Sequence, residues 1–360
     1  YFADNAEEFL QKEYIKTDYK ESYIQNEPLG VIFGIMPWNF PYWQVFRFTA
    51  PLLMAGNACV IKHAANVSGC SLLIEKVILD NSTYKNIYKT LIIPAEGVNA
   101  VISNNHIKAV SLTGSEEAGA SVAMHAGKEI KKIVLELGGS DPFIVLNDAD
   151  IKKASKVAVL ARFFNAGQSC IAAKRFLVHE DIHDEFVESV KKHNENLQVG
   201  NPMDENTQIG PLAKKEFVNE LHSMVQSSIN AGAKCLLGGK NDDTAFYTPT
   251  LLIDVKKDME VFTKETFGPV FCIMKINNID EAIKMANNSQ YGLGGSIWTE
   301  NIDLAKELSC KIDTGAIFIN EMTKSDPRLP FGGINKSGYG IELSKYGIKE
   351  FVNTKTIVIN

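Results

Sequence analysis

The sequence lacks several features typical of secreted, membrane-spanning and nucleic-acid-binding proteins. Only six of its 360 residues are cysteines and none forms a CxxC pair, which argues against a disulfide framework and favours reduced thiols in the cytoplasm. No apolar run is long enough to cross a bilayer and no basic-then-apolar leader is visible, so neither secretion nor a membrane partner is expected. A net charge of -6 gives no reason to expect nucleic acid as a partner.

Repeats and low-complexity tracts are also absent, and short apolar runs alternate with helical patterns instead. Strands are expected at 30–36, 57–62, 99–103, 109–114, 132–139, 142–146, 175–178, 270–276 and 315–320. This alternation predicts an α/β fold with parallel sheets built of βαβ units. The chain is too long for one usual core, so two domains are expected.

The two ends of the sequence resemble extended arms. Residues 10–28 are consistent with a hairpin and residues 352–360 with a terminal strand, and arms of this kind often pair between subunits. The chain begins at Tyr1 inside an apparent helix, so we expect an N-terminal part to be missing.

Cys170 stands in FFNAGQSC, directly after a helical pattern and a turn of small residues. Backbone N–H groups around such a turn can stabilise a thiolate, the form in which cysteine is a nucleophile. Taken alone, a cysteine of this kind is more often a small buried hydrophobe.

Two polar residues elsewhere suit acyl chemistry. Glu136 ends the apolar strand pattern KIVLE, where a partly desolvated carboxylate could serve as a general base. Asn39 lies in the turn MPWNFP and could donate to an oxyanion. A surface charge and a turn-forming asparagine are the alternatives.

Two further motifs are candidate ligand sites. Gly114 and Ser115 join a strand pattern to a helix start, which offers N–H groups to a phosphate, although GxGxxG is absent. HEDIH, residues 179–183, matches the zinc motif HExxH, but His179 ends an expected strand and Asp181 is the expected N-cap of the next helix. The two imidazoles then do not share a helix face, so no metal is expected.

Seven ordered motifs together resemble the aldehyde dehydrogenase superfamily over essentially the whole chain. They are MPWNFP, VIKHA, SLTGSEEAG, VLELGGSDP, FFNAGQSC, KETFGPV and PFGGINKSGYG. The resemblance implies a Rossmann-type cofactor domain (1–9 and 29–138), an α/β catalytic domain (139–340) and a small β oligomerisation arm (10–28 and 352–360).

The resemblance also implies roles for individual residues. Cys170 is similar to the nucleophile that carries a thioester, Glu136 to the base that activates water, and Asn39 to the oxyanion donor. The residues similar to the cofactor-binding set are Trp38, Lys62, Gly114, Ser115, Glu265 and Phe267.

Arg47 suggests the substrate, because its guanidinium could hold a carboxylate at the far end of an aldehyde. The sequence resembles the bacterial succinate-semialdehyde dehydrogenase branch, which carries arginine here. A second arginine found in some such enzymes is replaced by Phe164, so Ser325 or Arg328 is the expected additional contact. A solvated arginine is the alternative.

The cofactor is expected to be NAD or NADP. Residues 62–65 read KHAA where NAD-preferring relatives have KPAE, so the carboxylate that repels a 2′-phosphate is missing. The expected activity is oxidation of succinate semialdehyde to succinate in a homodimer or homotetramer. The alternatives are a broad aliphatic or amino-aldehyde dehydrogenase and a catalytically dead truncated relative.

Overall fold

The structure is a computed structural model that describes residues 1–360. It divides into two compact units, of which the first comprises Tyr1–Leu137, Ser325–Gly332 and Gly338–Asn360, and the second Gly138–Lys324 and Gly333–Ser337. Residues 325–332 and 338–340, expected in the second domain, therefore group with the first unit. The reason is backbone pairing, because Phe331 bridges Glu342 and Gly338 pairs with Glu136.

The first unit is built on a six-stranded sheet. Its order is β15 (Gly338–Tyr339), β7 (Lys132–Glu136), β6 (Ile107–Thr113), β3 (Val31–Met36), β4 (Ala58–His63) and β5 (Tyr88–Thr90). All pairs are parallel except β15 with β7. The central strand β3 is almost wholly apolar, as expected for a strand covered on both faces.

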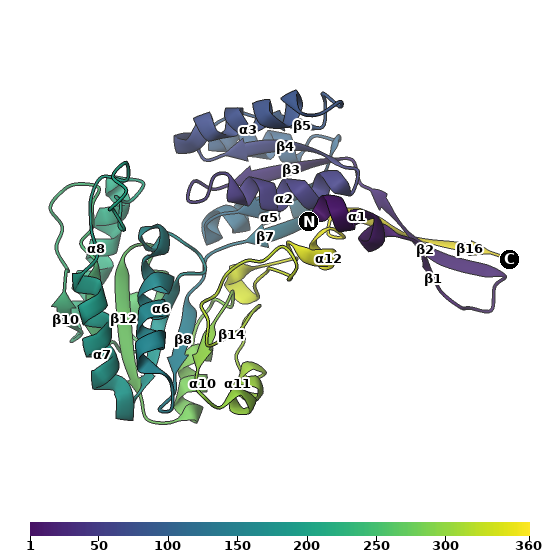
Figure 1. Ribbon diagram of the computed structural model, residues 1–360. Helices are drawn as coiled ribbons and strands as arrows, with labels where there is room; N and C mark the ends of the chain where they lie inside the picture. Colours follow the sequence, from purple (N-terminus) through teal and green to yellow (C-terminus); the bar gives the residue numbers. More distant parts are fainter. The chain divides into compact units, whose positions relative to one another are not determined.

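Helices cover both faces of this sheet; α2 runs beside β3 and α3 beside β4 and β5 (Figure 1). The helices of the first unit are α1 (Phe2–Leu10), α2 (Trp43–Met54), α3 (Ser68–Asp80), α4 (Val98–Ile102), α5 (Glu116–Lys128) and α12 (Ser344–Gly347), with 3-10 turns η1 (Ala65–Val67) and η2 (Ala95–Gly97).

The strand predicted at 99–103 is wrong, because these residues form helix α4. Val98 and Ile102 are the buried residues of α4 and lie four positions apart, one helical turn, so the short apolar run follows the helical period.

The chain changes direction across the first sheet beside β3. From β3 it proceeds to β4 and β5 on one side, and then returns to β6 and β7 on the other. In open α/β sheets, such a switch point leaves a crevice at the carboxyl ends of the strands, where ligands bind.

The second unit contains a seven-stranded sheet. Its order is β10 (Lys234–Leu237), β11 (Thr250–Ile253), β12 (Val270–Ile276), β9 (Ala173–His179), β8 (Asp141–Val145), β13 (Ser296–Trp298) and β14 (Phe318–Ile319). Only β10 and β11 pair antiparallel. The helices are α6 (Ile151–Phe163), α7 (Glu180–Glu195), α8 (Lys215–Asn230), α9 (Glu260–Thr263), α10 (Ile279–Asn287) and α11 (Ile302–Ser309), with 3-10 turns η3 (Phe164–Gly167) and η4 (Asn335–Ser337).

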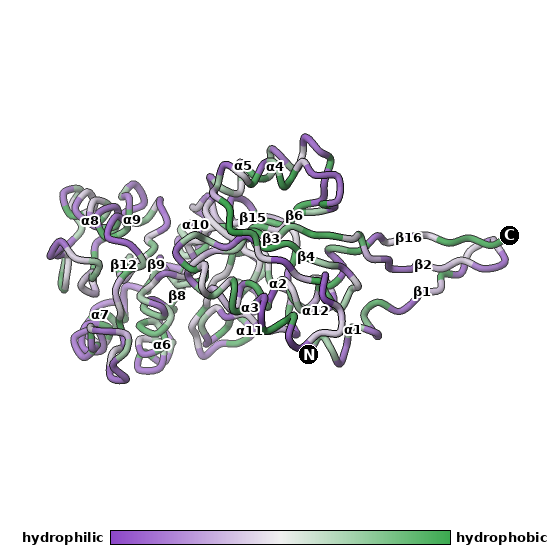
Figure 2. The backbone as a smooth tube through the Cα atoms, turned by 90° about the horizontal axis from the view of Figure 1, so that it is seen from above, coloured by the Kyte–Doolittle hydropathy of each residue, from purple (hydrophilic) through white to green (hydrophobic).

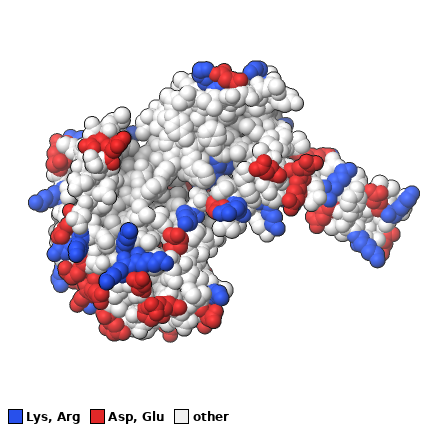
Figure 3. Space-filling model, viewed as in Figure 1, with Lys and Arg blue, Asp and Glu red and all other residues white.

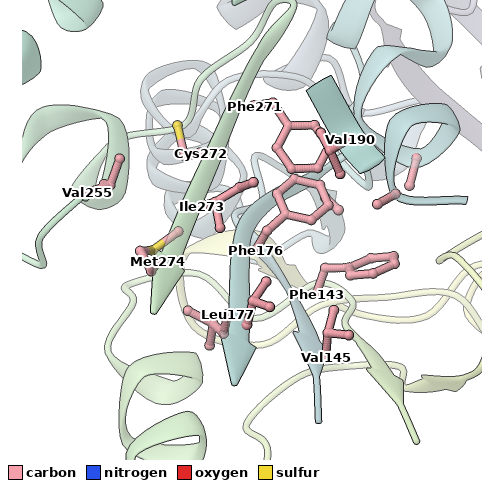
Figure 4. Packing of buried hydrophobic residues seen from close by; sticks show 14 of the residues in the cluster. Phe143, Val145, Phe176, Leu177, Val190, Val255, Phe271, Cys272, Ile273 and Met274 are labelled. Atoms are coloured by element: carbon pink, nitrogen blue, oxygen red, sulfur yellow. The ribbon is translucent and has the colours of Figure 1, made fainter. Parts of the chain in front are cut away.

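Aromatic stacking forms the centre of the second unit. The rings of Phe176 and Phe271 stack with centroids 3.7 Å apart, and Phe143 contacts Phe176 at 5.1 Å (Figure 4). These side chains are fully buried on adjacent strands. This core fixes the strands β8, β9 and β12, whose amino ends carry the loops described below.

An extended ribbon leaves the body of the first unit. Strand β2 (Glu21–Pro28) pairs antiparallel with β16 (Val352–Ile359) and with β1 (Glu13–Tyr14), so the predicted arm segments meet in one three-stranded sheet (Figure 1). The ribbon is largely exposed, and its apolar residues gather toward the C-terminal end of β16 (Figure 2).

None of the helices is both long and apolar enough to span a membrane. On the face shown in Figure 3, acidic and basic side chains are interspersed.

Candidate active site

Four of the predicted site residues lie at the carboxyl edge of the first sheet. Asn39 follows β3, Lys62 lies near the end of β4, Ser115 follows β6 and Glu136 ends β7. The four strands are parallel and adjacent, so the same edge of the sheet collects residues separated by about a hundred positions in sequence.

The β6–α5 turn has the features of an anion site. Ser115 caps helix α5, and its hydroxyl accepts from the Ala118 N–H at 3.3 Å. Gly114 donates its N–H to the carbonyl of Glu136 at 3.0 Å, which ties this turn to β7. The positive end of the α5 dipole therefore points out of the sheet edge, as the phosphate hypothesis requires.

Asn39, Trp38 and Lys62 are half-buried. The Asn39 Oδ1 accepts from the Phe40 N–H at 3.2 Å. Lys62 donates to the carbonyl of His63 at 3.3 Å, and burial lowers the pKa of its ammonium group while nearby Glu96 raises it.

Glu136 is a buried carboxyl without a hydrogen-bond donor. Its side chain is 1% exposed, and no protein group hydrogen-bonds either oxygen. Burial raises the pKa of Glu136 to about 8; the Arg47 guanidinium acts against this and the Glu342 carboxylate adds to it. A carboxyl with a pKa near neutrality can exchange protons under physiological conditions.

Arg47 lies in the same buried cluster. Its Nε forms an ion pair with Glu342, and its Nη2 lies 3.9 Å from the Glu136 Oε2. The guanidinium stacks over the Phe331 ring at 4.6 Å, and Phe331 exchanges two backbone hydrogen bonds with Glu342. Arg47 is therefore not a solvated helix-surface arginine.

Sequence reasoning missed Glu342. Burial raises the pKa of its carboxyl, and Arg47 opposes that shift. The available signal was its position between Ile341 and Leu343, a charged residue in an apolar pattern after the glycine-rich loop.

Ser325 and Arg328 lie in the loop that precedes Phe331. Ser325 is half-buried, whereas the Arg328 side chain is 73% exposed and donates from Nε to Asp326 at 2.8 Å. The pairing with Asp326 raises the pKa of Arg328.

The second unit holds Cys170 at the end of a strained turn. Asn165, Ala166 and Gly167 have φ values of 53°, 53° and 74°, a left-handed conformation that non-glycine residues rarely adopt. Arg162 stabilises this turn because its guanidinium donates to four buried carbonyls, those of Gly167, Ala173, Thr266 and Gly268. Strain maintained by surrounding contacts is typical of functional sites.

Glu265 contacts the connection that precedes β8 and a lysine that follows the nucleophile. Its Oε1 accepts from the Gly139 N–H at 3.1 Å and from the Lys174 ammonium at 3.2 Å. A Cβ at Gly139 would lie 2.6 Å from the carbonyl oxygen of Cys170, so only glycine allows this approach. Phe267, two residues after Glu265, is half-buried.

Three buried cations near these loops were also missed by sequence reasoning. Lys174 and Arg162 are fully buried, and Arg175 donates to the carbonyls of Ser140, Met285 and Ala286. For Lys174 and Arg175 the signal was the run AAKRF, in which two charges enter a buried strand.

The prediction that Asp181 caps the helix after HEDIH is wrong. His179 is the N-cap of α7, because its ring accepts from the Asp181 N–H at 3.3 Å. His183 lies one turn inside that helix and bonds Asp184 at 2.8 Å.

Comparisons with known proteins identify the family of the chain. A model of the aldehyde dehydrogenase family matches residues 1–357. The chain belongs to the aldehyde dehydrogenase family. The family resemblance and the predicted α/β fold are thereby confirmed.

Similar aldehyde dehydrogenases come from several bacteria. The probable succinate-semialdehyde dehydrogenase (NADP(+)) of Synechocystis sp. is 49% identical over 100% of this chain and 80% of its own length. Succinate-semialdehyde dehydrogenase (NADP(+)) 1 of Mycobacterium tuberculosis is 47% identical with the same coverage. The succinic semialdehyde dehydrogenase of Streptococcus pyogenes in complex with NADP+ superposes with a TM-score of 0.97 at 40% identity, covering 100% of this chain and 79% of that one.

The raised pKa of Glu136 predicts a pH-dependent stability. The folded protein holds the Glu136 proton up to about pH 8, whereas an unfolded glutamate releases it near pH 4.3, so the free energy of unfolding falls as pH rises between these values. Glu136→Gln removes this loss of stability, because glutamine does not titrate. We therefore expect denaturant unfolding from pH 4 to pH 9 to show that the free energy of unfolding of the variant rises relative to that of the parent. The total rise should be about 1.4 kcal/mol for each unit by which the folded pKa of Glu136 exceeds its unfolded pKa. A difference that is constant with pH would contradict the raised pKa.

Proposed function

We propose that this aldehyde dehydrogenase oxidises succinate semialdehyde to succinate with NADP, through a thioester on Cys170. The observation that carries the proposal is the buried Glu136–Arg47 pair, since a desolvated base and a cation beside it suit an aldehyde that bears a carboxylate. The names of the relatives in Synechocystis and Mycobacterium support the same substrate and cofactor.

Cys170 performs the first half of the reaction. Its thiolate attacks the aldehyde carbon, and the carbonyl oxygen takes the negative charge of a hemithioacetal. The Asn39 amide is the proposed donor to that oxygen, a role in which one hydrogen bond is worth about 3 kcal/mol of transition-state stabilisation. A nicotinamide cofactor, when bound, would supply the acceptor for the hydride that leaves this carbon.

Glu136 performs the second half. Its ionised carboxylate takes a proton from a water molecule, which attacks the thioester carbon and expels the Cys170 thiolate with succinate as product. The pKa of about 8 makes Glu136 a stronger base than an exposed glutamate, at the cost of being mostly protonated at pH 7.

The first unit has a donor set that fits NADP. The α5 N-terminus with Gly114 and Ser115 suits the pyrophosphate, and Lys62 at the end of β4 suits the adenosine ribose. The turn from Lys62 to Ala65 carries no carboxylate, so nothing on it repels a 2′-phosphate. In the second unit, Glu265 is the proposed partner of the nicotinamide ribose, with Phe267 beside it, and Trp38 of the first unit lies on the proposed cofactor path.

Arg47 is the proposed clamp for the substrate carboxylate, with Ser325 or Arg328 as the additional contact. Because Arg47 pairs with Glu342 in the structure, the substrate competes with a carboxylate of the protein. In the alternative, a broad aliphatic or amino-aldehyde dehydrogenase, Arg47 does not bind the substrate and only compensates the negative charges of Glu136 and Glu342.

The ribbon of β1, β2 and β16 is the proposed oligomerisation arm of a homodimer or homotetramer. Three exposed strands have little core of their own, and Tyr14, Val358 and Ile359 expose between 42% and 66% of their surface. Pairing with another subunit would cover these groups. A cytoplasmic location is proposed because the reaction needs Cys170 reduced.

The first experiment measures nicotinamide reduction with succinate semialdehyde and with butanal, each with NADP and with NAD. We expect at least about tenfold higher kcat/KM for succinate semialdehyde, as one charged contact provides, and no turnover in Cys170→Ala. Equal rates for the two aldehydes would reject the substrate, and turnover without Cys170 would reject the mechanism.

Replacing Arg47 separates a clamp from a charge balance. If Arg47 binds the substrate, Arg47→Met raises KM for succinate semialdehyde by about 30-fold or more and leaves KM for butanal nearly unchanged. Lys345→Met, an exposed lysine of the same unit, is the matched control. An equal loss of kcat for both aldehydes, without a change in KM, would assign Arg47 to Glu136 and Glu342 alone.

Cofactor selection is tested at Ala65. Ala65→Glu restores the carboxylate that opposes a 2′-phosphate, and we expect kcat/KM for NADP to fall about 100-fold while that for NAD changes far less. Ala65→Gln has the same shape without the charge, so it should retain most of the NADP activity. A similar loss in both variants would indicate a steric effect and reject the electrostatic explanation.

A further inference from the structure

Lys174 occupies an unusual place for a lysine. Its side chain is 0% exposed, and it is the second residue of strand β9, four residues after Cys170. The ammonium donates to the carbonyls of Ser169, Cys170 and Ala172 at 3.0, 2.8 and 3.1 Å, and it lies 3.2 Å from the Glu265 Oε1. Every proton of the ammonium therefore has an oxygen partner, and two of those partners flank the proposed nucleophile.

We propose that Lys174 is a positioning residue for Cys170, whose buried ammonium holds the nucleophile loop and stabilises the thiolate form of its sulfur. The inference deepens the proposed function and rests on Cys170 being the nucleophile. It adds a residue that touches neither the substrate nor the cofactor.

The balance of buried charges supports this role. The cations of this region are Lys174, Arg162 and Arg175, and the carboxylates are Glu265 and Asp141. One positive charge remains uncompensated, and a Cys170 thiolate would neutralise it. Burial raises the pKa of Asp141 to about 6, so it is still largely ionised at pH 7.

The electrostatic coupling agrees with the geometry. Burial lowers the pKa of Lys174, while Glu265, Asp141 and a Cys170 thiolate raise it and Arg162 lowers it. Coupling between two groups is reciprocal, so a thiolate that favours the ammonium is favoured by it to the same extent.

Lys174 also joins the two loops of the proposed chemistry. Glu265, the proposed ribose ligand, accepts from Lys174 and from Gly139 through the same oxygen, and Gly139 packs on the Cys170 carbonyl. The nucleophile and the ribose ligand are thus fixed to one buried cation.

The test measures the rate of Cys170 alkylation by iodoacetamide against pH, in the full chain without aldehyde. The signal from other cysteines is subtracted with Cys170→Ala. We expect Lys174→Met to move the midpoint of the profile upward by about one pH unit, which slows alkylation about tenfold at pH 7. Glu265→Gln keeps the shape of the side chain and removes a negative charge, so it should move the midpoint downward.

The opposite directions of the two expected shifts distinguish an electrostatic role of Lys174 from a purely structural one. If Lys174 only supports the fold, both variants shift the midpoint in the same direction or leave it unchanged, and the inference is overturned. Lys275→Gln, which removes an exposed charge from strand β12, is the control and should leave the midpoint unchanged. Where Lys174→Met fails to fold, the shift of Glu265→Gln alone decides.

The outcomes also separate this inference from the proposed function. A Cys170 that reacts no faster than exposed Cys310 would reject the nucleophile itself. A reactive Cys170 whose profile ignores Lys174 and Glu265 would retain the nucleophile and reject only the role of Lys174.

Discussion

Three full positive charges buried beside the nucleophile loop require oxygen partners, and much of the second unit is arranged to provide them. Arg162 and Lys174 are satisfied almost entirely by backbone carbonyls from two segments, around Cys170 and around Glu265. An unpaired charge in this place would cost several kcal/mol. Neither segment can therefore move without exposing a buried cation, and this constraint maintains the left-handed turn at Asn165 and Ala166.

The first unit applies the same physics with the signs reversed. One guanidinium, that of Arg47, lies between the carboxyl groups of Glu136 and Glu342, so the cluster has an excess of negative charge when both ionise. Burial raises the pKa values of Glu136 and Glu342, and the neighbouring Glu342 carboxylate adds to the rise at Glu136. An excess of positive charge in one unit suits a thiolate, and an excess of negative charge in the other suits a proton acceptor.

Much of this architecture could be predicted from the sequence, and what could not has a common cause. Apolar runs such as those at 30–36 and 270–276 identified strands because periodicity is a local property, whereas the run at 99–103 was too short to distinguish a strand from helix α4. Cys170 and Glu136 stood out through family motifs. Lys174, Arg162 and Glu342 did not, because the environment of a buried charge depends on partners that lie far away in the sequence, as Glu342 and Arg47 do.

The position of Glu136 is difficult to explain by stability. A buried carboxyl without a donor destabilises the fold whenever it ionises, and a glutamine of the same shape would avoid that cost. A base for thioester hydrolysis, by contrast, needs both desolvation and a pKa that is still accessible at neutral pH. Burial alone would raise the pKa of Glu136 further, and Arg47 limits the rise. The guanidinium thus keeps the base usable in addition to any contact with substrate, and this dual demand accounts for an arginine, permanently charged, where a lysine could lose its proton.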